Sequence, residues 1–235
     1  MTSPHGSDID RRALRDQVYD RILELLLEGD MEPGTRLSSD NLARDLQVSP
    51  TPVREAMVHL ERTGLVTREA RKGYRVAPPL SSQQLEELFE ARLMLELTAV
   101  AGASRHAETA VRDLRRAHEA HLGAAERVIA AHSGESRVPI RITQDYFQAD
   151  AEFHATIFEH ARNRYVLDMY SQLDALTHRM RQAALQGPAD VREAVAEHQA
   201  ILDAFESGTS EEIVASMRAH IENVQQRALF DSQSD

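Results

Sequence analysis

Residues 42–66 read LARDLQVSPTPVREAMVHLERTGLV, and they fix the architecture of the first part of the chain. Apolar residues recur at one-turn spacing on both sides of a central break, which predicts two short helices that each bury one stripe of side chains. Ser49 is placed to cap the second helix, and Pro50 and Pro52 fall in its first turn, where a missing N–H costs little. The pattern therefore predicts a helix, a tight turn and a second helix.

The second helix has a polar face that suits contact with DNA. With its apolar residues turned inward, Thr51, Arg54, Glu55 and Arg62 remain on the opposite side. Hydroxyl and guanidinium groups near a helix start are what a recognition helix places in the major groove. Arg54 is the best candidate for a base contact, because a guanidinium can pair with both acceptors on the guanine edge. From spacing alone, a buried helix pair in an ordinary helical protein is an equally good interpretation.

The residues after the second helix favour the DNA-binding interpretation. Residues 65–68 and 74–76 read as two short strands around a polar turn that ends at Gly73. A two-stranded hairpin directly after a helix-turn-helix is a wing. Its tip carries the cations Arg71 and Lys72 beside Gly73, whose backbone can approach a phosphate closely.

Residues 18–76 resemble the winged helix-turn-helix of the GntR family of bacterial transcription regulators. The resemblance rests on PGTRL at 33–37, LARDL at 42–46, VSPTPVREAM at 48–57, LERTGLV at 60–66 and KGYRV at 72–76. Members of this family bind operator DNA as dimers. Many members have arginine where this chain has Pro50, so the resemblance implies no DNA contact for Pro50. The contacts that the resemblance implies are Arg36, Ser49, Thr51, Pro52, Arg54 and Gly73.

Charge is divided unevenly along the chain. The whole sequence of 235 residues has a net charge of −11, which looks unsuited to a DNA-binding protein. Residues 36–75 nevertheless contain eight basic and five acidic residues, whereas residues 81–235 contain 15 arginines and 25 acids. The positive charge therefore lies where the winged helix-turn-helix needs it, and the acidic remainder should repel phosphate.

Composition also indicates a compartment. The chain has no cysteine, which excludes disulfides and thiolate metal sites and suits a reducing cytoplasm. No apolar run approaches the roughly 20 residues that span a bilayer, and no apolar leader opens the chain. We therefore expect a cytoplasmic protein without a membrane partner.

The fold class predicted for the whole chain is mainly α. We expect a loose tail at 1–10, then a winged helix-turn-helix domain at 11–78 with three helices and a two-stranded β wing. Pro78 and Pro79 end the wing and begin a linker. An all-α six-helix bundle should fill residues 79–232. Its helices are expected at about 82–104, 107–132, 143–161, 163–185, 189–206 and 210–229.

Four residues of this bundle form a candidate metal site. Asp150 and His154 lie four apart and share one helix face, while His198 and His220 fall on the last two helices. Three imidazoles and a carboxylate suit a divalent ion such as Zn²⁺, Ni²⁺ or Mn²⁺. An Asp-x3-His pair is more often a solvated face or a helix-stabilising pair. Apolar residues flank each of the four, however, and a histidine turned towards a bundle interior needs a partner there.

Residues 81–229 are similar to the FCD domain, the effector-binding part of the FadR branch of GntR regulators. The order of the four candidate ligands and the helix residues Arg92 to Glu96 carry the similarity. In such domains the metal helps to hold a small organic acid, and the resemblance makes Arg92 the candidate partner of its carboxylate. Arg92 could equally be a structural pair with Glu96. The remaining histidines match no motif position and are expected at the surface or in the core: His106, His118, His121, His132, His160 and His178.

The sequence therefore predicts a ligand-responsive transcription regulator that is not an enzyme, and specifically a homodimeric repressor. Its effector would be a sugar acid or another carboxylate. One alternative is a metal-dependent hydrolase fused to a DNA-binding head, but the chain has no HExxH motif, and Glu152 points to a different face from Asp150. The other alternative is an interaction bundle without metal, in which the histidines are merely packed.

Overall fold

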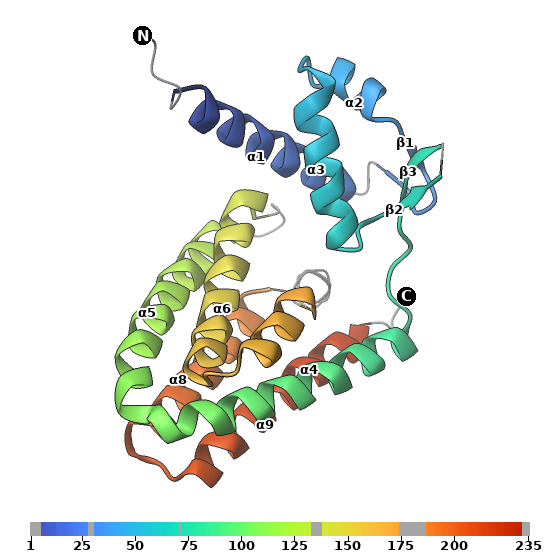
Figure 1. Cartoon of the computed structure of the whole chain (residues 1–235). Helices are drawn as coiled ribbons and strands as arrows, with labels where there is room; N and C mark the ends of the chain where they lie inside the picture. Colours follow the sequence, from blue (N-terminus) through green and yellow to red (C-terminus); the bar gives the residue numbers. More distant parts are fainter. Residues whose placement is uncertain (1–5, 28–30, 71, 133–137, 174–186, 232–235) are drawn as a thin grey trace. The chain divides into compact units, whose positions relative to one another are not determined.

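A computed structural model describes residues 6–27, 31–70, 72–132, 138–173 and 187–231 (Figure 1). The chain divides into two compact units, Met1–Pro79 and Leu80–Asp235. We call them the amino-terminal unit and the helical unit.

The amino-terminal unit is a winged helix-turn-helix whose sheet has three strands. The predicted two-stranded wing is confirmed as the hairpin of β2 and β3, and a short strand before the helix-turn-helix, β1, adds to it by pairing antiparallel with β3, which gives the order β1-β3-β2. The expected loose tail at 1–10 is corrected for residues 6–10, because the first helix begins at Gly6. The elements are α1 (Gly6–Leu27), β1 (Arg36–Leu37), α2 (Ser39–Asp45), α3 (Pro50–Arg62), β2 (Val66–Glu69) and β3 (Gly73–Val76).

The core of this unit lies between α1 and α3, and most of its residues come from the stripes that the sequence predicts, with Leu23 and Pro52 in addition. In the turn before α3, Gln47 adopts a left-handed backbone conformation with φ 56°. Ser49 occupies the N-cap position of α3 as predicted, but its side chain makes no capping hydrogen bond. The buried residues of the two helices are Val18, Ile22, Leu23, Pro52, Val53, Ala56, Met57 and Leu60.

The helical unit is an all-α domain, as the sequence predicts. The helix expected at 163–185 is helical over 164–173, and its remainder lies outside the described residues. The short helix η1 (Ser104–His106) separates the first two long helices. The long helices are α4 (Ser82–Ala103), α5 (Ala107–Ala131), α6 (Ile140–His160), α8 (Pro188–Ser207) and α9 (Ser210–Asp231).

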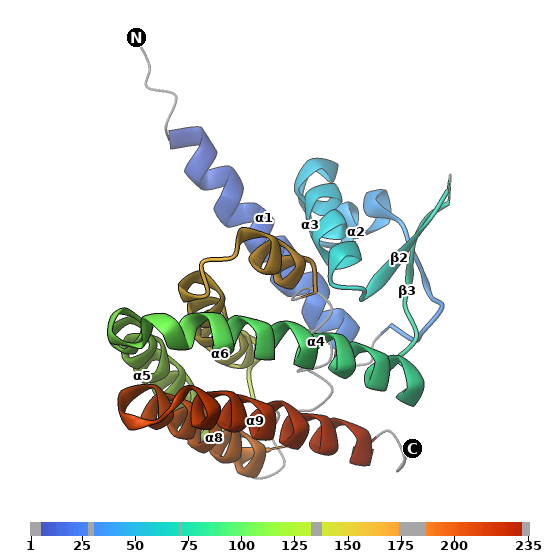
Figure 2. The ribbon, with the colours of Figure 1, turned by 60° about the horizontal axis from the view of Figure 1, so that its bottom comes forward.

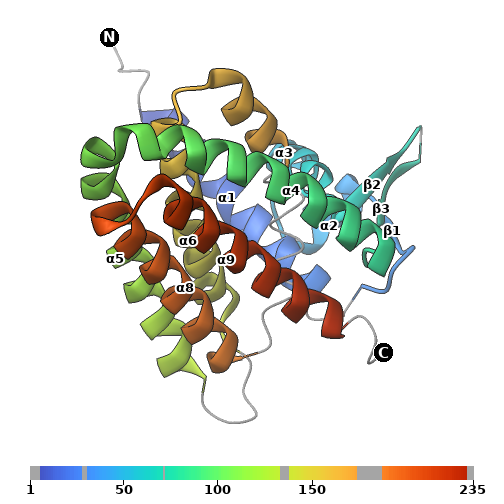
Figure 3. The same cartoon turned by 90° about the horizontal axis from the view of Figure 1, so that it is seen from below.

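The packing of these helices encloses a small group of polar side chains in a mainly apolar core. Helix α5 packs on α6 and α8, and α9 runs alongside α4 and α8 (Figures 2 and 3). Most of the side chains between them are apolar, but the arginine, glutamate and histidines described below are buried in the same layer. None of the helices described here is both long enough and apolar enough to cross a membrane.

Candidate metal centre and DNA-binding face

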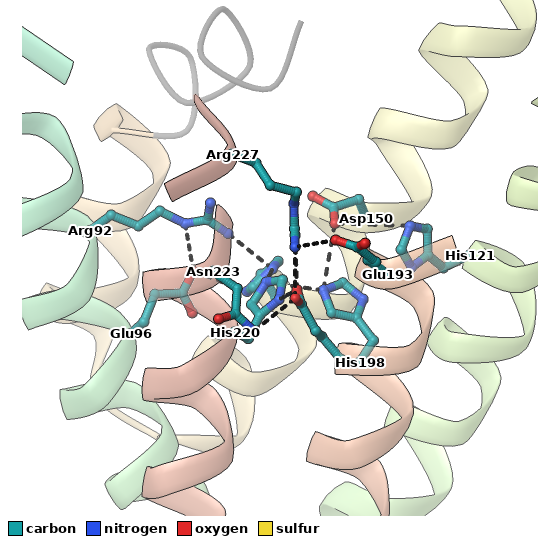
Figure 4. A network of polar contacts seen from close by, with 11 residues as sticks. Arg92, Glu96, His121, Asp150, Glu193, His198, His220, Asn223 and Arg227 are labelled. Carbon is teal, nitrogen blue, oxygen red and sulfur yellow. Dashed lines mark hydrogen bonds and ion pairs between the residues drawn. The ribbon is translucent and has the colours of Figure 1, made fainter. Parts of the chain in front are cut away.

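Three histidines meet in the interior of the helical unit. His154 comes from α6, His198 from α8 and His220 from α9, and all three side chains are buried. The Nε2 atom of His220 lies 3.3 Å from that of His198 and 3.3 Å from that of His154 (Figure 4). Three imidazoles that the sequence separates by up to 66 residues therefore point their Nε2 atoms at one region.

Carboxylates lie on the other side of two of these rings. His220 Nδ1 lies 2.8 Å from Glu197 Oε2, and His154 Nδ1 lies 3.0 Å from Glu96 Oε1. A carboxylate accepts but does not donate, so the contact with Glu197 places the proton of His220 on Nδ1 and leaves a lone pair on Nε2. His154 Nε2 also carries a lone pair, because it accepts from Nη2 of Arg92. Nε2 lone pairs that face one another repel, and a cation between them removes that repulsion. The donor arrangement therefore fits a divalent metal ion.

Asp150 joins this cluster through His198. Its Oδ1 atom lies 3.5 Å from His198 Nε2, and 3.9 Å from the Nε2 atom of a further histidine, His121 of α5. His121, Asp150 and His198 form a second group of close donors that shares His198 with the group of three histidines. The structure thus groups three of the predicted ligands, His154, His198 and His220, and places the fourth, Asp150, in the second group beside His198. That second group also contains His121, which was expected to be an ordinary surface or core residue.

The sequence did not predict His121 as a ligand, because it matches no position of the motif. One signal was nevertheless available. His121 continues the buried stripe of α5 formed by Leu114, Ala117, Ala124 and Val128, at intervals of three and four residues. A histidine on such a stripe must lie in the core.

Arg92 forms the predicted pair with Glu96 and also contacts the histidine cluster. Its side chain is 1% exposed, and its Nε donates to Glu96 Oε1 at 3.3 Å. Its Nη2 lies 3.0 Å from His154 Nε2, so the guanidinium also reaches the histidine cluster. Burial by itself raises the pKa of Glu96, but His154 and Arg92 outweigh it and lower that pKa to about 2. Glu96 is therefore a fixed negative charge beside the cluster.

A second arginine–glutamate group holds His220. Arg227 of α9 contacts both carboxylate oxygens of Glu197, at 2.8 and 3.0 Å, and Asn223 donates to the same carboxylate at 3.0 Å (Figure 4). Burial favours the neutral form of Glu197, yet hydrogen bonds from His220 and Arg227 lower its pKa to about 2. No sequence pattern indicates this group, because Glu197 and Arg227 belong to different helices.

Burial keeps three imidazoles of the cluster, those of His121, His198 and His220, neutral at physiological pH. Burial lowers the pKa of His220 to about 4 and that of His121 to about 4, and it holds the pKa of His198 well below the usual 6.5. Neutral imidazole is the form that binds a metal ion, so no proton has to be removed from these rings at pH 7.

The predicted DNA-contact residues of the amino-terminal unit are largely exposed. Arg54 lies on the open face of α3, with Nη2 3.2 Å from Asp40 Oδ1 of α2. Pro52 is an exception: it is buried and packs inside the unit, so its side chain cannot reach DNA. Arg71 lies outside the described residues. The exposed residues of the predicted set are Arg36, Ser49, Thr51, Arg54, Arg62, Lys72 and Gly73.

The backbone of the wing requires a glycine at position 73. Gly73 has φ +89°, and a Cβ atom at this position would lie 2.8 Å from the carbonyl oxygen of Leu37. The close approach of β1 to β3 therefore requires glycine, whether or not its backbone also meets a phosphate.

Two family descriptions match the chain, one for each unit. Residues 14–76 match "Bacterial regulatory proteins, gntR family", and residues 87–223, more than half of the chain, match the FCD domain. A winged helix-turn-helix followed by an FCD domain defines a class of DNA-binding transcription regulators. The chain belongs to the GntR family and carries the FCD domain of its FadR branch.

Known regulators are similar over most of the chain. The uncharacterized HTH-type transcriptional regulator YdhC of Bacillus subtilis is 26% identical over 205 residues, 87% of this chain and 86% of that protein. YcbG of the same organism, also an uncharacterized HTH-type transcriptional regulator, is 30% identical over 184 residues, 72% of this chain and 71% of that protein. The structure of E. coli McbR/YncC has the same fold, with a TM-score of 0.65 at 23% identity, and the match covers 94% of this chain and 99% of that one. These relatives are regulators rather than enzymes.

Proposed function

We propose that the protein is a homodimeric repressor, and that a small carboxylate bound beside a divalent metal ion in the helical unit controls its affinity for operator DNA. The observation that carries this proposal is the meeting of Nε2 atoms from α6, α8 and α9, with two separations of 3.3 Å. A carboxylate effector would act only through its difference in affinity between the DNA-competent and incompetent states.

Protein side chains would hold the ion and fix its surroundings. His154, His198 and His220 would supply nitrogen donors, and Asp150, which lies 3.5 Å from His198, is the proposed carboxylate ligand. This set of donors suits Zn²⁺, Ni²⁺ or Mn²⁺. When bound, such an ion would supply a positive charge and Lewis acidity that attract the oxygens of an organic acid. Glu197 accepts from the Nδ1 of His220, which keeps that ring turned toward the cluster.

Arg92 is the proposed partner of the effector carboxylate. Its Nη2 contacts the same His154 nitrogen that would face the ion, so ion and guanidinium compete for one lone pair. A guanidinium displaced from that nitrogen keeps its charge inside the cluster and can pair with a carboxylate through two parallel hydrogen bonds. The hydrogen bond from Arg92 Nε to Glu96 would keep the guanidinium near the cluster after it leaves His154.

The hydrolase alternative lacks a general base in this arrangement. Water activation beside a metal needs a carboxylate that is free to take a proton. Glu96 is engaged by Arg92, and Glu197 by Arg227 and His220. The relatives are also regulators, so we propose sensing without turnover.

A thermal-shift screen of small organic acids tests the sensor. The purified protein is treated with chelator, divided, and reloaded with Zn²⁺, Ni²⁺ or Mn²⁺ in separate portions. A true effector should raise the melting temperature only in a metal-loaded portion, by an amount equivalent to about 2.7 kcal/mol at 100 times its Kd. The response should be lost in His220→Ala and kept in His160→Ala, because His160 pairs with Asp113 away from the cluster. No retained metal and no metal-dependent shift would refute the metal sensor.

A selection from random double-stranded DNA tests the other half. Enriched sequences should bind the full chain, and Arg54→Ala should weaken binding by about 1–3 kcal/mol while relaxing the preference at one base pair. Arg218→Ala, an exposed arginine of α9, is the matched control and should change neither. The effector found in the screen should release this DNA, whereas tighter binding would contradict repression. Analytical ultracentrifugation of the free protein tests the homodimer.

A further inference from the structure

His121 is the buried histidine whose surroundings the proposed site leaves unexplained. Its side chain is 0% exposed, and neither ring nitrogen has a hydrogen-bond partner in the part of the chain that the structure describes. A neutral imidazole carries one donor and one acceptor, and burying both without partners is costly. A ligand that binds one of these nitrogens would remove part of that cost.

The neighbours of His121 are metal-binding groups. Its Nε2 lies 3.9 Å from Asp150 Oδ1, which in turn lies 3.5 Å from His198 Nε2. The rings of His121 and His198 have centroids 4.7 Å apart, and Tyr146 packs on His121 with centroids 4.9 Å apart. Donor atoms that each lie about 2.1 Å from one ion are at most about 4.2 Å apart, so both separations from Asp150 are compatible with a shared ion.

We propose that His121 is itself a metal ligand. With Asp150 and His198 it forms a second position for the ion, which overlaps the position formed by His154, His198 and His220. Both positions use Nε2 of His198, and one lone pair binds one ion, so the cluster takes a single ion per chain. This inference rests on the proposed metal site and adds to it a second, alternative position for the same ion, in which His121 replaces His154 and His220 as a ligand.

Loss of affinity alone cannot test this proposal. A residue that merely positions Asp150 would also weaken metal binding about 10- to 100-fold when it is removed. The test therefore has to count the imidazoles bound to the ion. Cobalt(II) serves as the probe, because the N–H proton of a cobalt-bound histidine gives a strongly shifted, exchangeable proton NMR signal.

The experiment compares the cobalt-loaded full-length protein with two variants. Because one ion per chain occupies the first position in some molecules and the second in others, exchangeable shifted signals from four histidines are expected in the unmodified chain. In His121→Gln the signal of one histidine should be lost. His118→Gln is the matched control, because His118 is buried on the same helix one turn earlier and belongs to neither donor group. It should keep all four.

The outcomes separate the two proposals. Signals from only three histidines in the unmodified protein overturn the role of His121. This outcome is measured on the unmodified protein alone, so it does not depend on whether a variant folds. That role is equally overturned if His121→Gln folds and loses no signal. If cobalt does not bind to the full-length protein at all, then the metal site itself fails, and the ligand role of His121 fails with it.

Discussion

Replacing Glu96 by glutamine removes one charge from the centre of the helical unit and almost nothing else. Glutamine has the same shape as glutamate and can still accept a hydrogen bond from Arg92. The guanidinium of Arg92 would then be a buried cation without a counter-charge at its nearest neighbour. We expect Glu96→Gln to destabilise the chelator-treated protein substantially, because an uncompensated buried charge is expensive.

Two independent routes give the same magnitude. The fall of the Glu96 pKa from 4.5 to about 2 corresponds to about 3 kcal/mol in favour of the ionised form, at about 1.4 kcal/mol per pKa unit. Removing one partner of a buried ion pair costs about 3–5 kcal/mol in other proteins. The stabilisation is complete above pH 4.5 and is lost as pH falls towards 2, so the gap between the two proteins should narrow in acid.

Urea unfolding followed by circular dichroism measures this cost, with equal m-values as the check that both proteins unfold alike. Glu90→Gln, on the exposed side of the same helix, is the matched control and should stay within about 0.5 kcal/mol. The double variant Arg92→Met with Glu96→Leu should recover most of the loss, since apolar replacements of a whole buried pair are often neutral. A cost below about 1 kcal/mol for Glu96→Gln would refute the reasoning.

Three further predictions concern the amino-terminal unit. Gly73→Ala should destabilise it by about 1–3 kcal/mol in urea unfolding, because of the positive φ and the Leu37 carbonyl oxygen 2.8 Å away. Gln47→Gly should stabilise it by up to about 1 kcal/mol by relieving φ 56°, and Gln47→Ala should give no gain. Burial and the nearby Arg15 lower the pKa of His59, so its NMR titration midpoint should fall below 6.5, and its contribution to stability should be lost as pH falls below 6.5.

The features that could be predicted from the sequence are those that one segment determines alone. The start of α3 was predictable because Pro50 and Pro52 tolerate the first turn of a helix. Strand β1 was not, because its two residues are too few to show alternation and only their pairing with β3 defines them. The start of α1 at Gly6 was not predictable either, because its first residues are mostly polar and show no apolar stripe that would indicate a helix.

The same distinction applies to the histidine cluster. Asp150 and His154 share a helix face by their spacing, so a site could be suspected from one segment. The contacts of Glu96 with His154 and of Glu197 with His220 join different helices, and no periodicity records them. His121 belongs with these tertiary features, because its value as a donor depends on the packing of α5 against α6 and α8.

The helices that supply these side chains suggest how binding could reach the DNA-binding unit. One ion would tie together α6, α8 and α9, which carry His154, His198 and His220. Helix α4 contributes no donor to either group and instead carries Arg92 and Glu96, which contact His154. It is also the helix that follows the wing directly, since residues 77–81 join β3 to its start. A carboxylate that draws Arg92 away from His154 would therefore act on α4 rather than on the metal-bound helices. For this reason Arg92→Met should abolish the response to the acid while leaving metal binding intact, and a variant that loses both would place Arg92 in the metal site itself.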